Sequence, residues 1–173
     1  RVLADHGVDA VIHFAALIEA GESMKQPETY FRNITAGSLS LLEAMLAQGV
    51  NRIVFSSTAA VYGTPESLPI RENAPLRPTN AYGAAKLMVE NMLGWFHQIH
   101  GLRYAALRYF NAAGAAPPLG EDHQPESHLI EGAMRDAYDA QALLPADAAS
   151  SPESARLRNP LSGQPQGAPC DAT

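Results

Sequence analysis

Short apolar runs alternate along the chain with longer segments of helical periodicity. Residues 9–16, 50–57 and 103–110 are largely apolar and of strand length, which is typical of strands buried in a parallel sheet. Residues 27–48 and 81–100 carry apolar side chains at helical spacing, and a glycine follows each. The alternation predicts an α/β fold in which right-handed crossovers join three parallel strands, with helices over both faces of the sheet.

Other segments depart from this alternation. Residues 64–80 contain four prolines among charged residues and predict an irregular surface loop. A helix is expected over residues 131–142, whereas alanine, proline, serine and glycine dominate residues 143–173 and predict a disordered tail. We therefore expect a domain over residues 1–130 and a divergent tail over residues 131–173.

Composition narrows the class of protein. The chain has 173 residues, 46% of them hydrophobic and 17% charged, which suits one globular domain. A net charge of -6 disfavours a nucleic-acid surface, and no run has the length of a membrane span. The single cysteine, Cys170, excludes an intrachain disulfide and a zinc site built from cysteines. We expect a cytoplasmic protein that binds neither nucleic acid, membrane nor metal.

Candidate chemistry begins where the second apolar run ends in Ser56, Ser57 and Thr58, as expected for a strand that ends at a ligand crevice. Tyr82 and Lys86 are four residues apart and therefore share one face of a helix. A nearby ammonium favours the phenolate, so Tyr82 can act as a base on an alcohol while Thr58 relays the proton. Loss of that proton lets the carbon release a hydride. A Tyr-x-x-x-Lys motif also arises by chance, and the hydroxyl residues upstream favour the catalytic interpretation.

These residues, together with Val61-Tyr62-Gly63, resemble the extended short-chain dehydrogenase/reductase family, whose members act on nucleotide sugars. Within that family, residues 16–23, 107–111 and 120–130 are most similar to the UDP-hexose 4-epimerases. The resemblance covers residues 2–130. It implies a Rossmann-like fold, a tightly held NAD, a UDP-sugar substrate that is reversibly inverted at carbon 4, and a homodimer.

The resemblance also assigns roles to single residues. It implies that the cofactor is contacted by Phe14, Ala15, Ala16, Asn33, Ser56, Tyr82, Lys86 and Phe110. It implies that the sugar nucleotide is contacted by Thr58, Tyr82, Asn111, His128 and Leu129. Ile18 stands where some epimerases carry a lysine that reaches the cofactor. From the residues alone, an exposed helix side chain is the lesser alternative for Asn33, and His13 is a packed histidine with a satisfied ring.

Two features of such a protein find no match in this chain. The glycine-rich turn that receives the pyrophosphate at a helix N-terminus is absent, as is the acidic residue that binds the ribose. The expectation is therefore a fragment: a partial doubly wound parallel sheet, with the N-terminal nucleotide-binding half missing and an irregular C-terminal tail. Its affinity for the cofactor should be weak.

Two alternative functions remain open from the sequence. The first is a nucleotide-sugar 4,6-dehydratase, which typically carries Asp-Glu directly after the threonine; Ala59 and Ala60 stand there and disfavour it. The second is an inactive fragment, or a non-catalytic module that binds a nucleotide or another protein. The sequence leaves open whether N-acetylated sugars are accepted.

Overall fold

The computed structural model describes residues 2–112 and residue 114. The chain divides into two units, Arg1–Gly114 and Ala115–Thr173, and the description below concerns the first of them. The helix expected over residues 131–142, the tail over residues 143–173 and the boundary at residue 130 lie outside the described residues.

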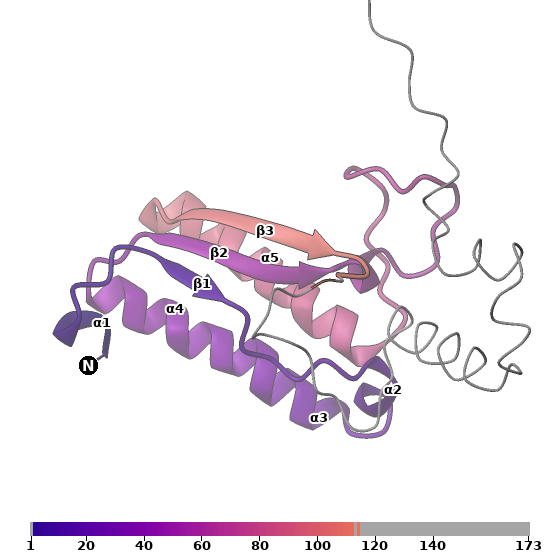
Figure 1. Ribbon diagram of the computed structural model, residues 1–173, viewed down its shortest axis with the longest axis horizontal. Coiled ribbons are helices and arrows are strands. Elements are labelled where there is room, and N and C mark those ends of the chain that lie inside the picture. Colours follow the sequence, from indigo (N-terminus) through magenta and orange to yellow (C-terminus); the bar gives the residue numbers. More distant parts are fainter. Residues whose placement is uncertain (1, 113, 115–173) are drawn as a thin grey trace, which may run out of the picture. The chain divides into compact units, whose positions relative to one another are not determined.

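Three strands form one parallel sheet, as the sequence predicts. These are β1 (Val11–His13), β2 (Arg52–Thr58) and β3 (Arg103–Tyr109), hydrogen-bonded in the order β1-β2-β3 (Figure 1). Strands of one direction end at the same edge of a sheet, so their carboxyl ends lie side by side. β1 is shorter than the expected strand over residues 9–16, because only three of its residues pair with β2.

A long helical segment connects β1 to β2. It consists of α3 (Pro27–Tyr30), the π-helix η1 (Phe31–Ala36) and α4 (Gly37–Ala47), in direct succession. The predicted helix over residues 27–48 is therefore confirmed in extent, although its middle is a π-helix. Such π segments often occur at functional sites.

The connection from β2 to β3 ends in α5 (Ala81–His100), the other long helix. Asn80 caps it, because its side-chain oxygen accepts a hydrogen bond of 2.7 Å from the Gly83 amide. Gly101 ends it with a φ of 69°, the left-handed conformation that glycine adopts at low cost. Single turns complete the described part: α1 (Val2–Asp5), α2 (Ala20–Ser23) and the 3₁₀ turn η2 (Ala59–Tyr62).

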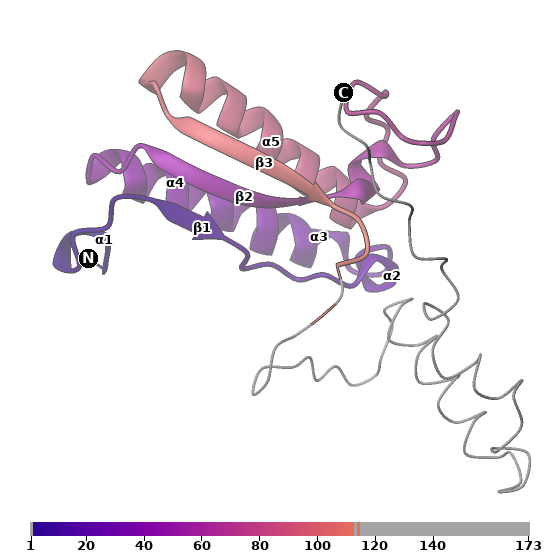
Figure 2. The same cartoon turned by 45° about the horizontal axis from the view of Figure 1, so that its top comes forward.

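The long helices cover one face of the sheet. In Figure 1, α4 lies below the strands, and in Figure 2 both α4 and α5 lie behind them. Right-handed crossovers that advance in one direction place every connecting helix on the same side, and the other side is covered only where the strand order reverses. For the described residues, the prediction that helices cover both faces is therefore wrong.

The hydrophobic core lies between the sheet and these helices. Fully buried members come from α3, η1, α4, β2 and α5, and they include Tyr30, Ile34, Leu42, Met45, Phe55, Val89 and Leu93. The Tyr30 hydroxyl donates a hydrogen bond of 2.9 Å to Glu22, and burial, followed by that carboxylate, raises the pKa of Tyr30 to about 12. The core joins α3, α4 and α5 to β2, and this holds the start of α5 at the end of β2.

The opposite face of the sheet is apolar and open among the described residues. Ile12 on β1 is 66% exposed, and Phe14, Leu107 and Tyr109 are exposed beside it. The expectation that all three strands are buried is therefore wrong for β1 and β3. These are the two edge strands, and neither carries a helix over its outward side chains.

Candidate functional site

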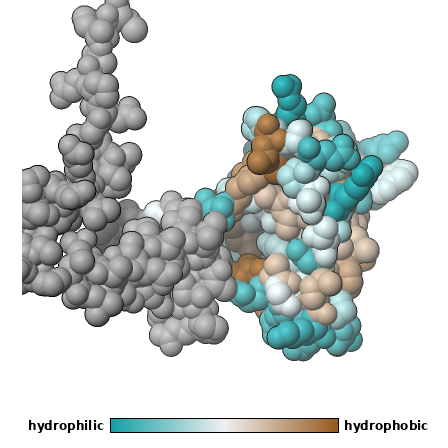
Figure 3. Space-filling model, turned by 90° about the vertical axis from the view of Figure 1, so that its right-hand side faces the viewer, coloured by the Kyte–Doolittle hydropathy of each residue, from teal (hydrophilic) through white to brown (hydrophobic). Residues whose placement is uncertain are grey.

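The predicted catalytic residues meet where β2 ends and α5 begins. Thr58 is the last residue of β2, and Tyr82 and Lys86 lie in the first two turns of α5. The Thr58 hydroxyl accepts a hydrogen bond of 3.2 Å from the Ala60 amide and so caps η2. Figure 3 looks onto this end of the unit and shows hydrophilic and hydrophobic side chains interspersed.

Tyr82 is half-buried, and burial sets its acidity. Burial raises the pKa of Tyr82 above its ordinary value of 10.0, and a hydrogen bond with the Thr58 side chain lowers it in part. The backbone of η2, which follows Thr58, contacts the first turn of α5 at Gly83, so the structure brings Thr58 and Tyr82 to one site as predicted. In this structure, Thr58 is the group that favours the phenolate.

Lys86 is almost fully buried beneath Tyr82. Its ammonium donates a hydrogen bond of 2.8 Å to the carbonyl of Ser56 and lies 4.9 Å from the ring centre of Phe55. Burial lowers the pKa of Lys86 to about 8. The ammonium lies 5.8 Å from the ring centre of Tyr82. The Ser56 carbonyl thus holds the ammonium beside the Tyr82 ring, and a lowering of the pKa of Tyr82 by Lys86 stays a prediction.

Two glycines let η2 approach α5. A Cβ on Gly83 would lie 2.7 Å from the Ala60 carbonyl oxygen, so α5 and η2 are in backbone contact at that point. Gly63 has a φ of +63°, and a Cβ there would lie 1.9 Å from the Arg77 carbonyl oxygen. Both close approaches need glycine: the one at Gly83 brings η2 onto the first turn of α5, and the one at Gly63 brings the end of η2 against the loop before α5.

Ser23 is a site residue that sequence reasoning missed. It is fully buried at the end of α2, where its hydroxyl accepts a hydrogen bond of 3.1 Å from the Tyr82 amide. The same hydroxyl donates to the Ala20 carbonyl at 2.6 Å. Ser23 thus satisfies an amide in the first turn of α5. Its 59-residue separation from Tyr82 leaves no local signal for this contact.

The residues assigned to the cofactor by resemblance follow the strand ends. Phe14, Ala15 and Ala16 come directly after β1, and the Phe14 ring is stacked with that of Tyr109 at 6.2 Å between centres. Phe110 follows β3 and is exposed. Ser56 lies on β2 between these edges and binds Lys86 through its carbonyl.

Asn33 lies in the π-helix η1, and its side chain forms a hydrogen bond with the segment after β1. It is exposed, but its side-chain oxygen accepts a hydrogen bond of 3.0 Å from the Leu17 amide. It therefore ties the segment after β1 to the helix. The alternative interpretation, an exposed helix asparagine without a specific contact, does not explain this hydrogen bond.

Of the remaining predicted residues, Asn111 follows β3 and is exposed, as is Ile18 after β1. His128 and Leu129 lie outside the described residues. His13 is half-buried, and its Nε2 lies 2.9 Å from the Ser38 hydroxyl. The expectation of a histidine with a satisfied ring is confirmed. Burial, and then the charge of Lys86, lower the pKa of His13.

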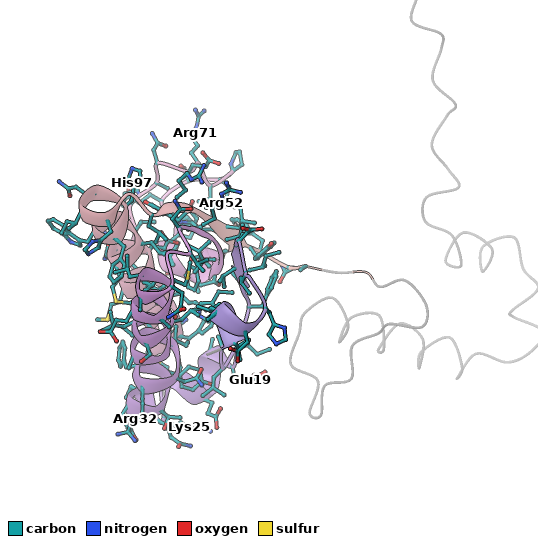
Figure 4. All side chains as sticks on the ribbon, turned by 90° about the vertical axis from the view of Figure 1, so that its left-hand side faces the viewer. Glu19, Lys25, Arg32, Arg52, Arg71 and His97 are labelled. Carbon is teal, nitrogen blue, oxygen red and sulfur yellow. The ribbon has the colours of Figure 1, made fainter. Side chains whose placement is uncertain are left out.

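The buried cations contrast with the surface ones. Lys25, Arg32 and Arg71 point away from the body of the unit, as solvated side chains do (Figure 4).

Within residues 2–112, no cluster of three or more histidine, cysteine or acidic side chains could hold a metal ion. In that same part of the chain, no helix has both the length and the apolar character needed to cross a membrane.

The parallel sheet, with Thr58, Tyr82 and Lys86 at its carboxyl edge, defines an α/β protein of Rossmann-like fold. Residues 1–151 match the model of the NAD dependent epimerase/dehydratase family, and the chain belongs to that family.

Two curated relatives and one solved structure to which the chain is similar are UDP-glucose 4-epimerases. The chain is 56% identical over 137 residues to a UDP-glucose 4-epimerase of Azospirillum brasilense, and 53% identical over 131 residues to one of Halalkalibacterium halodurans. These matches cover 78% and 75% of the chain, but 39% of each relative. The crystal structure of UDP-glucose 4-epimerase from Brucella ovis, in complex with NAD, superposes with a TM-score of 0.76 at 45% identity, over 83% of this chain and 45% of that one. The chain thus spans about two fifths of the length of the curated relatives.

Proposed function

We propose that the chain carries the catalytic segment of a UDP-glucose 4-epimerase, which interconverts UDP-glucose and UDP-galactose in galactose metabolism. The observation that carries this proposal is the convergence of Thr58, at the end of β2, with Tyr82 and the buried Lys86 in the first two turns of α5. The names of relatives that are 53–56% identical support the particular reaction.

The residues present fit a nicotinamide cofactor. The small side chains of Ala15 and Ala16 leave room for a flat ring at the end of β1, and Lys86 has two ammonium hydrogens beyond the one given to Ser56. These residues, with Phe14, Asn33, Ser56 and Phe110 as the resemblance implies, would hold NAD. Bound NAD would supply a reversible acceptor for the hydride of carbon 4 and, in its oxidised form, a positively charged ring.

Each catalytic side chain then has a defined task. Tyr82 takes the proton of the sugar 4-hydroxyl and later returns it, while Thr58 orients that hydroxyl by hydrogen bonding. With a pKa of about 8, Lys86 remains mostly protonated at neutral pH and can donate to a cofactor hydroxyl. Asn111, with His128 and Leu129 by resemblance, would contact the sugar nucleotide.

The dehydratase alternative lacks its acid and base. Ala59 and Ala60 follow Thr58 in η2, and neither can exchange a proton. Detection of a stable 4-keto-6-deoxy product would favour the dehydratase over the epimerase.

The proposal is tested in two proteins. In the first, the chain replaces the matching segment of the Azospirillum brasilense relative, and this chimera should convert UDP-glucose to UDP-galactose in a coupled assay. The second is the 173-residue chain itself, titrated calorimetrically with NAD. An inactive chimera that still folds and binds NAD would contradict the epimerase proposal, and tight saturable binding by the chain alone would contradict the fragment alternative.

A homodimer is part of the proposal, and an exposed apolar stripe on α5 supports it. Met88, Trp95 and Ile99 follow one another at intervals of seven and four residues and are all exposed, Trp95 by 61%. We expect sedimentation equilibrium to show a dimer that Trp95→Glu dissociates. Leu68→Glu, at an exposed apolar residue outside α5, is the matched control and should leave the dimer intact. A monomeric parent chain would remove this part of the proposal.

A cytoplasmic location also belongs to the proposal. The single cysteine suits a reducing compartment, where structural disulfides do not form.

A further inference from the structure

A half-buried ion pair joins β3 to α5 beside the site. Arg108 Nε donates to Glu90 Oε1 at 3.1 Å, and Nη2 donates to Oε2 at 2.7 Å. The two side chains are 23% and 10% exposed, whereas those of the pair Arg77–Glu66 are each 75% exposed. Two parallel hydrogen bonds fix direction as well as distance, so the pair holds β3 and α5 in one relative orientation.

The same ion pair is bonded to both sides of Thr58. The Ser57 hydroxyl, one residue before Thr58, donates to Glu90 Oε1 at 2.5 Å. Tyr62, four residues after Thr58, accepts a hydrogen bond of 2.9 Å from Arg108 Nη1. The turn that presents the Thr58 hydroxyl is therefore tied at both ends to one pair of charges.

Arg108 also anchors the loop that follows η2. Its Nη1 donates to the Glu72 carbonyl at 3.2 Å, and its guanidinium carbon lies 5.0 Å from the ring centre of Tyr62. A guanidinium can bind partners in these different directions at once, because its donors are arranged in a rigid planar fork. A lysine offers a single point of contact instead.

Helix α5 connects this network to the catalytic residues. Tyr82, Lys86 and Glu90 follow at intervals of four and lie on one helix face. Glu90 fixes Ser57 on the strand that ends in Thr58, while Tyr82 projects from the same helix. The separation between the Thr58 and Tyr82 hydroxyls is thus set partly by the position of Glu90.

We propose that Arg108, acting through Glu90, is a positioning residue that holds the Thr58 hydroxyl against the Tyr82 phenol. This inference deepens the proposed function and rests on it for its catalytic meaning. Neither side chain of the ion pair touches the reacting atoms. A pair that only stabilised the fold would leave the Thr58–Tyr82 hydrogen bond unchanged in any variant that still folds.

The test measures the ionisation of Tyr82 in the 173-residue chain without cofactor or substrate. The chain is labelled with 3-fluorotyrosine, whose more acidic phenol titrates at lower pH, and Tyr82→Phe assigns its fluorine resonance. The variant Arg108→Met/Glu90→Gln leaves no buried charge unpaired, and the glutamine oxygen still accepts from Ser57. We expect an upward shift of the Tyr82 pKa of roughly 0.5–1 unit, because one hydrogen bond is lost.

Two further variants make the outcome decisive. In a Thr58→Val background, Arg108→Met/Glu90→Gln should produce no additional shift, since the hydrogen bond is already gone. Arg108→Lys keeps the charge but not the fork, and should give a smaller shift than the double variant. The proposal is overturned by an unshifted Tyr82 in the folded variants, or by a shift that persists without Thr58. The titration needs no turnover, so an inactive chimera would count against the epimerase alone.

Discussion

Tyr82→Phe is expected to lower the rate of UDP-glucose epimerisation by about 10²–10⁴-fold, the usual loss when a general acid–base group is removed. The substitution deletes the phenol oxygen but keeps the ring that packs against the core. The amide of residue 82 still donates to Ser23, so the start of α5 is preserved. The measurement is steady-state turnover in the Azospirillum brasilense chimera, with substrate binding followed by calorimetry.

A second tyrosine provides the control. Tyr104→Phe also removes one phenol oxygen. Tyr104 lies at the amino end of β3, away from the carboxyl ends of the strands where the site lies, so the rate should be unchanged. Thr58→Val should cost less than Tyr82→Phe, because it removes an orienting group. The Thr58 hydrogen bond lowers the pKa of Tyr82, so its loss should move the pH–rate profile to higher pH. Near-parental turnover by the Tyr82→Phe chimera would take Tyr82 out of the mechanism.

Local patterns in the sequence predicted most of the described fold. The helix that ends at Gly101 follows from the helical spacing of its apolar residues and from the glycine after it, which are local signals. The parallel sheet follows from apolar runs alternating with helices. The exposure of the edge strands could not be predicted in this way. Apolar residues such as Ile12 and Leu107 indicate that burial would be favourable, but not whether another layer covers them.

The candidate site was predictable in its residue types but not in its electrostatics. Thr58, Tyr82 and Lys86 could be found because a strand end and an i,i+4 helix pair are local signals. The Ser56 carbonyl that holds the Lys86 ammonium gives no such signal, since every residue has a carbonyl. The bonds from Glu90 to Ser57 and Arg108 span 33 and 18 residues, and only the folded chain brings these side chains together.

Raising the pH from 7 to 9.5 is expected to increase the free energy of unfolding of the chain by about 2 kcal/mol through Lys86 alone. The pKa of Lys86 is lowered from its ordinary value of 10.5 to about 8 because the ammonium is buried. Between these two values the unfolded chain binds more protons than the folded chain, so stability rises with pH. Above pH 10 the trend should reverse, because the raised pKa values of Tyr30 and Tyr82 leave them protonated in the folded state while they ionise in the unfolded chain.

Urea unfolding followed by circular dichroism at pH 7 and pH 9.5 checks this prediction, and Lys86→Met is the matched control. Methionine has a similar length and no charge, so its variant should lack the rise between the two pH values. The carbonyl of Ser56 loses its partner in that variant, but this cost is the same at both pH values and cancels in the comparison. A rise of equal size in the Lys86→Met chain would assign the effect to other groups and would mean that the buried ammonium costs little. If the free energy of unfolding rises with pH in the parent chain but not in the Lys86→Met variant, the fold retains a destabilising cation at the point where the proposed site needs a charge.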